Sequence, residues 1–245
     1  MNINLFRTKE GMGMAAAQKA AEILKDAINK KGEAHFIAAT GASQFEFLEQ
    51  LIQLHSIDWS KTRMFHLDEY VGLPENHPAS FRKYLKDRFI SKTRPGQIYL
   101  IEGDAQDPKE ECERLNRIIS QKELDVAFVG IGENGHLAFN DPPADFETER
   151  PYIIVELDDA CRKQQLGEGW FESLEDVPEK AISMSVKQIM KSKHIICTVP
   201  DKRKAQAVKD CFKGYKISPD CPASILKKHE NCFIFLDEQS SIYLK

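Results

Sequence analysis

Short apolar segments alternate with amphipathic segments along most of this chain, and that alternation constrains the fold more than any other feature. Buried β-strands are predicted at residues 34–39, 62–67, 97–101, 124–130, 151–156, 194–199 and 232–236. Helical periodicity predicts helices at residues 15–28, 44–54, 80–90, 107–120, 185–191 and 201–212. This order predicts an α/β fold, with a mainly parallel, Rossmann-like sheet and helices on both of its faces. No linker, repeat or low-complexity segment interrupts the pattern, so residues 1–245 are predicted to form a single domain.

The composition excludes several classes of protein. At 245 residues the chain can bury a substantial core, and its apolar segments are too short to cross a membrane. The net charge of −4, with both signs interspersed, gives no general attraction for nucleic acid or anionic membranes. No signal-peptide pattern opens the chain, and its six cysteines form no C-x-x-C pair, which favours reduced thiols over disulfides or a zinc site. We therefore expect a cytoplasmic protein whose partner is a small molecule.

A glycine-rich turn follows the strand expected around residues 124–130 and presents His136. Asn134 precedes this histidine by two residues, and Asp141 follows it by five. An imidazole that titrates near neutral pH, with a carboxylate in reach, is suited to moving protons. Open α/β sheets bind their ligands in loops of this kind, at the carboxyl ends of strands. These residues are candidates for acid–base catalysis, and the alternative is an ordinary loop with a surface histidine.

Two adjacent carboxylates, Asp68 and Glu69, follow the strand expected at 62–67. Neighbouring side chains on an extended chain point in opposite directions, so only one of the two can face a given site. We expect one carboxylate to face a ligand site while the other supports the scaffold. The alternative is a solvated acidic turn, or a cap for the helix beginning near Ser80.

A turn of small residues follows the strand expected at 34–39, and it consists of Thr40, Gly41, Ala42 and Ser43. A strand, a short turn and a helix together can bind phosphate through free backbone N–H groups and the helix dipole. The turn is neither a Walker loop nor a G-x-G-x-x-G motif. By itself it is weak evidence, because Ser43 could simply cap the helix.

Taken together, these three segments resemble the glucosamine-6-phosphate deaminase (isomerase) family, within a wider group that includes 6-phosphogluconolactonases. Residues 40–43 look like the family's Thr-Gly-Gly-Thr phosphate turn, and residues 68–73 match its Asp-Glu-Tyr-Val-Gly-Leu segment. Residues 130–142 resemble its glycine-rich segment around Gly-His. Order and spacing agree over nearly the whole chain. The Phe139-Asn140 pair after the histidine favours the deaminases over the lactonases.

The resemblance implies catalytic roles for four residues. It places Asp68 as the carboxylate that moves a proton between C2 and C1 of the sugar, and His136 as the group that opens the ring. Asn134 and Asp141 would orient the imidazole. Asp141 replaces the family's glutamate and is one methylene shorter, while Asn134 replaces a common aspartate. No metal or organic cofactor is implied.

The resemblance also implies a phosphate pocket, in which the match is looser. Lys204 corresponds to the family's phosphate-binding lysine, alongside the turn at 40–43, although a solvated first helical turn would look the same. Gly169 stands where the family has a phosphate-binding arginine before an aromatic pair. The local segment is about two residues longer than the family pattern, and Arg162 or Lys163 is left as a candidate replacement.

The resemblance predicts an isomerising deaminase that converts glucosamine 6-phosphate, or a close amino-sugar phosphate, and water to fructose 6-phosphate and ammonia. One alternative is a sugar lactone hydrolase of the 6-phosphogluconolactonase type, and another is a non-catalytic sugar-phosphate sensor. Asp68 together with His136 disfavours the sensor, because binding alone needs neither a base nor a proton shuttle. A lactonase needs no base at C2. The sequence leaves open whether the chain forms a homo-oligomer.

Overall fold

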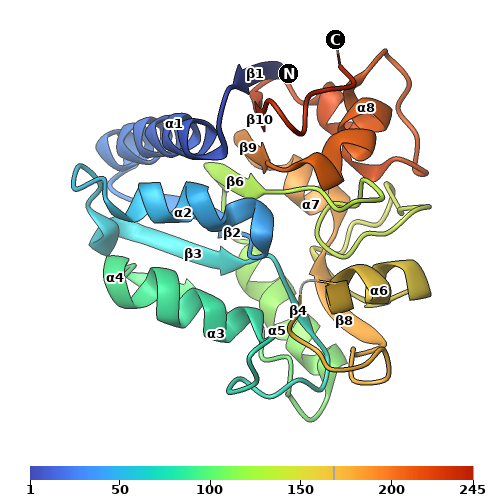
Figure 1. Ribbon diagram of the computed structural model, residues 1–245. Helices are drawn as coiled ribbons and strands as arrows, with labels where there is room; N and C mark the ends of the chain where they lie inside the picture. Colours follow the sequence, from blue (N-terminus) through green and yellow to red (C-terminus); the bar gives the residue numbers. More distant parts are fainter. Residues whose placement is uncertain (168, 245) are drawn as a thin grey trace.

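The computed structural model describes residues 1–167 and 169–244, and a seven-stranded, fully parallel sheet forms its centre (Figure 1). The strands lie in the order β1-β10-β9-β6-β2-β3-β5, and every pairing between neighbours is parallel. Their bounds are β1 (Asn2–Phe6), β2 (Ala34–Ala38), β3 (Thr62–His66), β5 (Gln97–Tyr99), β6 (Val126–Val129), β9 (His194–Val199) and β10 (Cys232–Asp237). The predicted α/β fold with a mainly parallel sheet is confirmed.

Helices cover both faces of this sheet. One face packs against α1 (Lys9–Lys31), α2 (Phe45–Ile52) and α3 (Phe81–Leu85), which continues through a π-helical turn, η3 (Lys86–Ile90), into α4 (Ser91–Thr93). The other face packs against α5 (Pro108–Ile119), α7 (Val186–Met190) and α8 (Ala205–Phe212). Side chains of β2 alternate between the two cores, with Phe36 on the first face and Ile37 on the second, because successive strand residues point to opposite faces.

A second sheet of three antiparallel strands lies beside the first. It consists of β4 (Asp68–Tyr70), β8 (Lys180–Met184) and β7 (Tyr152–Glu156). The strand expected at 151–156 therefore exists, but it does not belong to the parallel sheet. The helix α6 (Asp159–Gly167) packs against this small sheet through a separate apolar cluster (Figure 1).

The strands β1, β4 and β8 and the helix α6 were not predicted from the sequence. The edge strand β1 is largely exposed, so it lacks the apolar run that marks a buried strand. In α1, the side chain of Thr8 accepts a hydrogen bond from the Gly11 N–H and begins the helix earlier than its alanine stripe indicates. Among the described residues, no helix is long and apolar enough to cross a membrane.

Candidate active site

A cleft with about 530 Å³ of empty space opens at the carboxyl ends of β2, β6 and β9, next to the start of β4. Several chain segments far apart in the sequence line it. They contribute the turn at 40–43, Asp68, His136 and Lys204. The structure therefore brings the expected strand-end residues to one cleft, because parallel strands end at the same edge of a sheet.

The turn at 40–43 leads from β2 into a short 3₁₀ helix, η1 (Ala42–Gln44), and then directly into α2. Gly41 has a φ of 85°, in the left-handed region that favours glycine. The N–H groups of Ala42 and Ser43 begin this helical segment, where no preceding turn supplies carbonyl partners. The Thr40 hydroxyl is buried and has no hydrogen-bond partner among the described residues. The turn therefore presents unused donors to the cleft.

Gln44, which the sequence did not single out, ties this turn to two strands of the sheet. Its buried amide nitrogen donates to the Val129 carbonyl at 3.0 Å and lies 2.8 Å from the Thr198 hydroxyl. The Thr198 hydroxyl in turn donates to the Ser43 carbonyl at 2.8 Å. In the sequence, Gln44 is marked only as a polar residue at the start of the helix that packs on the sheet.

Lys204 also lines the cleft, from the 3₁₀ turn η4 (Lys202–Lys204) between β9 and α8. Only 6% of the residue is exposed, so it does not belong to a solvated helical turn. Its buried position at the cleft wall suits a contact with an anionic ligand group.

The two adjacent carboxylates have separate functions, as expected. Glu69 is fully buried and caps α3 by accepting hydrogen bonds from the N–H groups of Phe81 and Arg82 and from the Ser80 hydroxyl, at 2.8–3.2 Å. The sequence interpretation of a cap at this helix is therefore correct for Glu69. Asp68 points instead into the cleft.

The Asp68 carboxyl group makes no side-chain hydrogen bond with any described residue, although the residue is only 7% exposed. Burial, together with the neighbouring Glu69 charge, raises the pKa of Asp68 to about 8. A carboxyl group in this environment is a stronger base than an ordinary aspartate once ionised. Asp68 therefore suits proton transfer near neutral pH.

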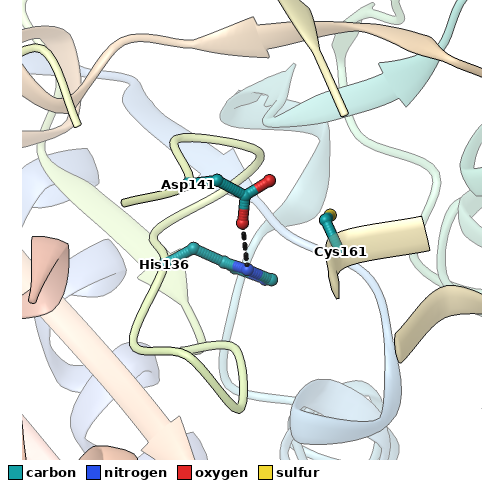
Figure 2. A group of neighbouring side chains, drawn as sticks. All are labelled: His136, Asp141 and Cys161. Atoms are coloured by element: carbon teal, nitrogen blue, oxygen red, sulfur yellow. Dashed lines mark hydrogen bonds and ion pairs between the residues drawn. The ribbon is translucent and has the colours of Figure 1, made fainter. Parts of the chain in front are cut away.

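His136 is held by Asp141 and Asn134, and Figure 2 shows the contact between Asp141 and the imidazole. The ring atom Nδ1 of His136 lies 2.9 Å from Oδ1 of Asp141. The backbone N–H of His136 donates a hydrogen bond to Oδ1 of Asn134 at 3.0 Å. Asn134 also donates to the same Asp141 oxygen at 2.9 Å. The shorter Asp141 side chain thus reaches the imidazole.

This network keeps Asp141 ionised and turns Nδ1 of His136 toward it. Burial disfavours the Asp141 carboxylate, but hydrogen bonds from His136 and Asn134 outweigh it and hold the pKa of Asp141 below its usual value. The ionised carboxylate accepts a hydrogen bond from Nδ1–H, which leaves Nε2 available for proton exchange. Gly132 packs directly against the ring, because an added Cβ would lie 2.2 Å from its Cε1 atom.

Neither candidate replacement for the missing arginine lines the cleft. Arg162 donates to the carbonyl groups of Leu174 and Val177 at 2.6–3.2 Å, and Lys163 is exposed on α6. Gly169 has a φ of 84°, so an arginine would adopt this backbone only with strain. The position itself therefore favours glycine.

Two glutamines of α6 line the cleft instead, and the sequence interpretation missed both. Oε1 of Gln165 accepts a hydrogen bond from the Tyr70 hydroxyl at 2.7 Å, and Oε1 of Gln164 accepts one from the Glu133 N–H at 2.9 Å. Nothing in their spacing marks them, because only the docking of α6 on the small sheet brings them to the cleft.

A parallel sheet with acid–base groups and an anion-binding turn at its carboxyl edge is the architecture of an α/β enzyme for a phosphorylated small molecule. More particularly, the profile of the family described as glucosamine-6-phosphate isomerases/6-phosphogluconolactonase matches residues 7–235. The chain belongs to this family.

Several relatives are similar over nearly their whole length. A glucosamine-6-phosphate deaminase of Oenococcus oeni is 37% identical over 229 residues, which cover 94% of each chain. One of Listeria monocytogenes is 34% identical, over 94% of this chain and 96% of the relative. A solved structure described as a monomeric glucosamine-6-phosphate deaminase is 30% identical, with a TM-score of 0.89 over 99% of this chain and 100% of the other. The 6-phosphogluconolactonase of Thermotoga maritima shares the fold, with a TM-score of 0.76, 16% identity and coverage of 96% and 98%.

Proposed function

We propose that the protein is an isomerising deaminase of amino-sugar metabolism. It converts glucosamine 6-phosphate, or a closely related amino-sugar phosphate, and water to fructose 6-phosphate and ammonia. The observation that carries this proposal is the Asp68 carboxyl group, buried without a hydrogen-bond partner among the described residues and facing the same cleft as His136. The deaminase names of relatives at 34–37% identity support it.

In this reaction His136 opens the sugar ring. Its Nε2 takes the proton of the anomeric hydroxyl and returns one to the ring oxygen, while Asp141 and Asn134 fix the orientation and tautomer of the imidazole. The product is an open-chain amino aldehyde, in which the hydrogen on C2 is acidified by the neighbouring carbonyl group.

Asp68 then carries the carbon proton transfer. Its ionised carboxylate removes the proton from C2 and returns it to C1, while the aldehyde oxygen gains a proton and the amine loses one. The amino aldehyde thereby becomes an imine at C2 with a hydroxyl group on C1. Water adds to this imine carbon, and ammonia leaves to give the ketose. The pKa of Asp68, raised to about 8 by burial, makes it a base of suitable strength.

The phosphate group is assigned to the turn at Thr40, Gly41, Ala42 and Ser43 and to Lys204. The turn supplies backbone N–H groups and the Thr40 hydroxyl, and the buried ammonium supplies the charge. No metal or organic cofactor takes part in any of these steps.

The two alternatives make different demands on Asp68. A lactonase of the shared fold needs no base at C2, and a sugar-phosphate sensor needs neither Asp68 nor His136. Purified protein is expected to release ammonia and form a ketose phosphate from glucosamine 6-phosphate without added metal. Clear hydrolysis of a 6-phosphate lactone without ammonia release would favour the lactonase.

The variant Asp68→Asn separates chemistry from binding. The amide keeps the shape of the side chain but cannot accept a proton, so exchange of the C2 proton with deuterated water should cease while substrate binding changes little. Exchange that persists in the variant would remove Asp68 from the role of base. Asp26→Asn, at an exposed aspartate of α1 outside the cleft, serves as the control for the same change of charge.

We further infer that residues 1–245 act as one deaminase domain in the cytoplasm. A homo-oligomer stays a prediction, and one solved relative is described as monomeric. Light scattering on the purified protein decides between the two states.

A further inference from the structure

We propose that His136, Asp141 and Cys161 form a binding site for a soft divalent cation such as Zn²⁺, and that its occupation inhibits the enzyme. One ligand atom from each residue lies within 4.8 Å of the other two. Figure 2 shows the three side chains turned toward one another, with Cys161 contributed by α6. The inhibition rests on the proposed deaminase activity, whereas cation binding does not.

A buried oxygen without a partner points to a ligand at this place. Oδ1 of Asp141 accepts hydrogen bonds from His136 and Asn134, but its second oxygen, Oδ2, is buried and has no hydrogen-bond partner within residues 1–167 and 169–244. The Asp141 side chain is only 10% exposed, and Cys161 is 1% exposed. An unsatisfied buried carboxylate oxygen beside a thiol is a ready cation ligand.

The spacing suits a tetrahedral ion after a small adjustment. Zinc bonds of about 2.0–2.3 Å place neighbouring ligand atoms roughly 3.3–3.8 Å apart, so rotations that move the side chains by about 1 Å are sufficient. His136 also lines the cleft, which leaves the fourth coordination position accessible to water. A thiolate, an imidazole and a carboxylate select Zn²⁺, Cd²⁺ or Co²⁺ over Mg²⁺ and Ca²⁺.

Binding should block the proposed ring-opening step. The Cys161 thiol releases its proton to solvent when the thiolate coordinates the ion. The imidazole of His136 then gives a lone pair to the metal and can no longer exchange protons with the sugar. The site is therefore inhibitory, and the enzyme itself needs no metal.

Inhibition is tested with zinc buffered by a chelator, and each variant is compared with its own uninhibited rate. The wild-type protein should lose most of its activity at micromolar free Zn²⁺ and recover it with excess chelator, while Mg²⁺ has no effect. Cys161→Ser should raise the half-inhibiting concentration at least tenfold. Cys221→Ser, which alters the more exposed thiol outside the cluster, should behave like the wild type. Equal inhibition of Cys161→Ser and the wild type overturns the proposal.

Cobalt titration provides a readout that does not depend on catalysis. Co²⁺ should bind the wild-type chain with one equivalent per chain and an absorption band in the near ultraviolet from thiolate-to-metal charge transfer. The band should disappear in Cys161→Ser and persist in Cys221→Ser. A wild-type protein without this band, or a band that survives in Cys161→Ser, overturns the proposed site. A protein that shows the band but releases no ammonia keeps the site and refutes the deaminase.

Discussion

Burial of Asp68, the base of the proposed reaction, lowers the stability of the protein at neutral and higher pH. Its folded-state pKa of about 8 lies above the value of an unfolded aspartate, so the folded protein holds a proton that the unfolded chain releases. This contribution to stability is fully present below about pH 4 and is lost as the pH rises to about 8. Each unit of pKa difference corresponds to about 1.4 kcal/mol, so the total is on the order of a few kcal/mol.

Asp68→Asn should therefore stabilise the protein. The amide does not ionise, so the melting temperature of the variant should exceed that of the wild type, and the difference should grow from pH 5 to pH 8.5. Thermal unfolding at several pH values measures it. A difference that is independent of pH would mean that Asp68 ionises at its ordinary pKa.

In the wild type, kcat/KM should rise with pH up to about 8, because the base must be ionised in the free enzyme.

Gly132 allows the imidazole of His136 to lie flat against the loop. In Gly132→Ala, a methyl group 2.2 Å from the ring would force His136 out of its position beside Asp141. A displacement of about 1 Å in a catalytic group can cost roughly 100-fold in rate, so kcat should fall by about this factor. Gly11→Ala is the control, since its added methyl group meets only Thr8 at an ordinary 3.5 Å. A variant at Gly132 with near-normal kcat contradicts the close packing.

Among the elements, the turn before α2 and η4 before α8 form the proposed phosphate pocket, whereas α6 contributes no cation that lines the cleft. Lys204→Ala should raise KM for the phosphorylated substrate at least tenfold, because a partly desolvated charge-assisted contact is worth roughly 1.5–3 kcal/mol. The same change should hardly affect an unphosphorylated amino sugar that the enzyme accepts. Steady-state kinetics with both substrates gives the ratio.

Arg162→Ala is the matched comparison on α6. Arg162 donates to the Leu174 and Val177 carbonyls, so its removal should loosen that loop without changing the preference for phosphorylated over free sugar. Hydrogen exchange over residues 172–178 should become faster. Arg162→Ala is compared with Lys204→Ala in the same assay. If both variants lose the preference for phosphorylated over free sugar equally, Arg162 binds the phosphate, contrary to its position in the structure.

At the scale of the whole molecule, the cleft joins both sheets, because residues from β2, β4 and β9 and from α6 line or border it. A non-reactive ligand that bridges these segments should therefore stabilise the entire fold. The reduced, open-chain amino-sugar alcohol 6-phosphate at 100 times its Kd should add about 2.7 kcal/mol. For a chain of this size, that corresponds to a rise in Tm of roughly 5–10 °C. The unphosphorylated alcohol at the same concentration is the control, and an equal rise with both contradicts the phosphate assignment.

The parallel sheet, most of its covering helices and the strand-end positions of the main candidate residues could be predicted from the sequence. Buried strands such as β2 and β6 leave continuous apolar runs, and the turns that follow them have local signatures in glycine, histidine and acidic residues. The direction of the strands then places those turns at one edge. Local patterns of this kind can be identified from the sequence without knowledge of the contacts in the folded protein.

Features that depend on contacts between distant segments could not be predicted from the sequence. The antiparallel sheet was not predicted, because β4 is three residues long and takes its form from pairing with β8, more than a hundred residues later. The same pairing sends Asp68 into the cleft and Glu69 to α3, and burial raises the pKa of Asp68. The docking of α6 brings Gln165 and Cys161 to the site while it turns Arg162 away. These outcomes follow from packing and desolvation, which no single segment encodes.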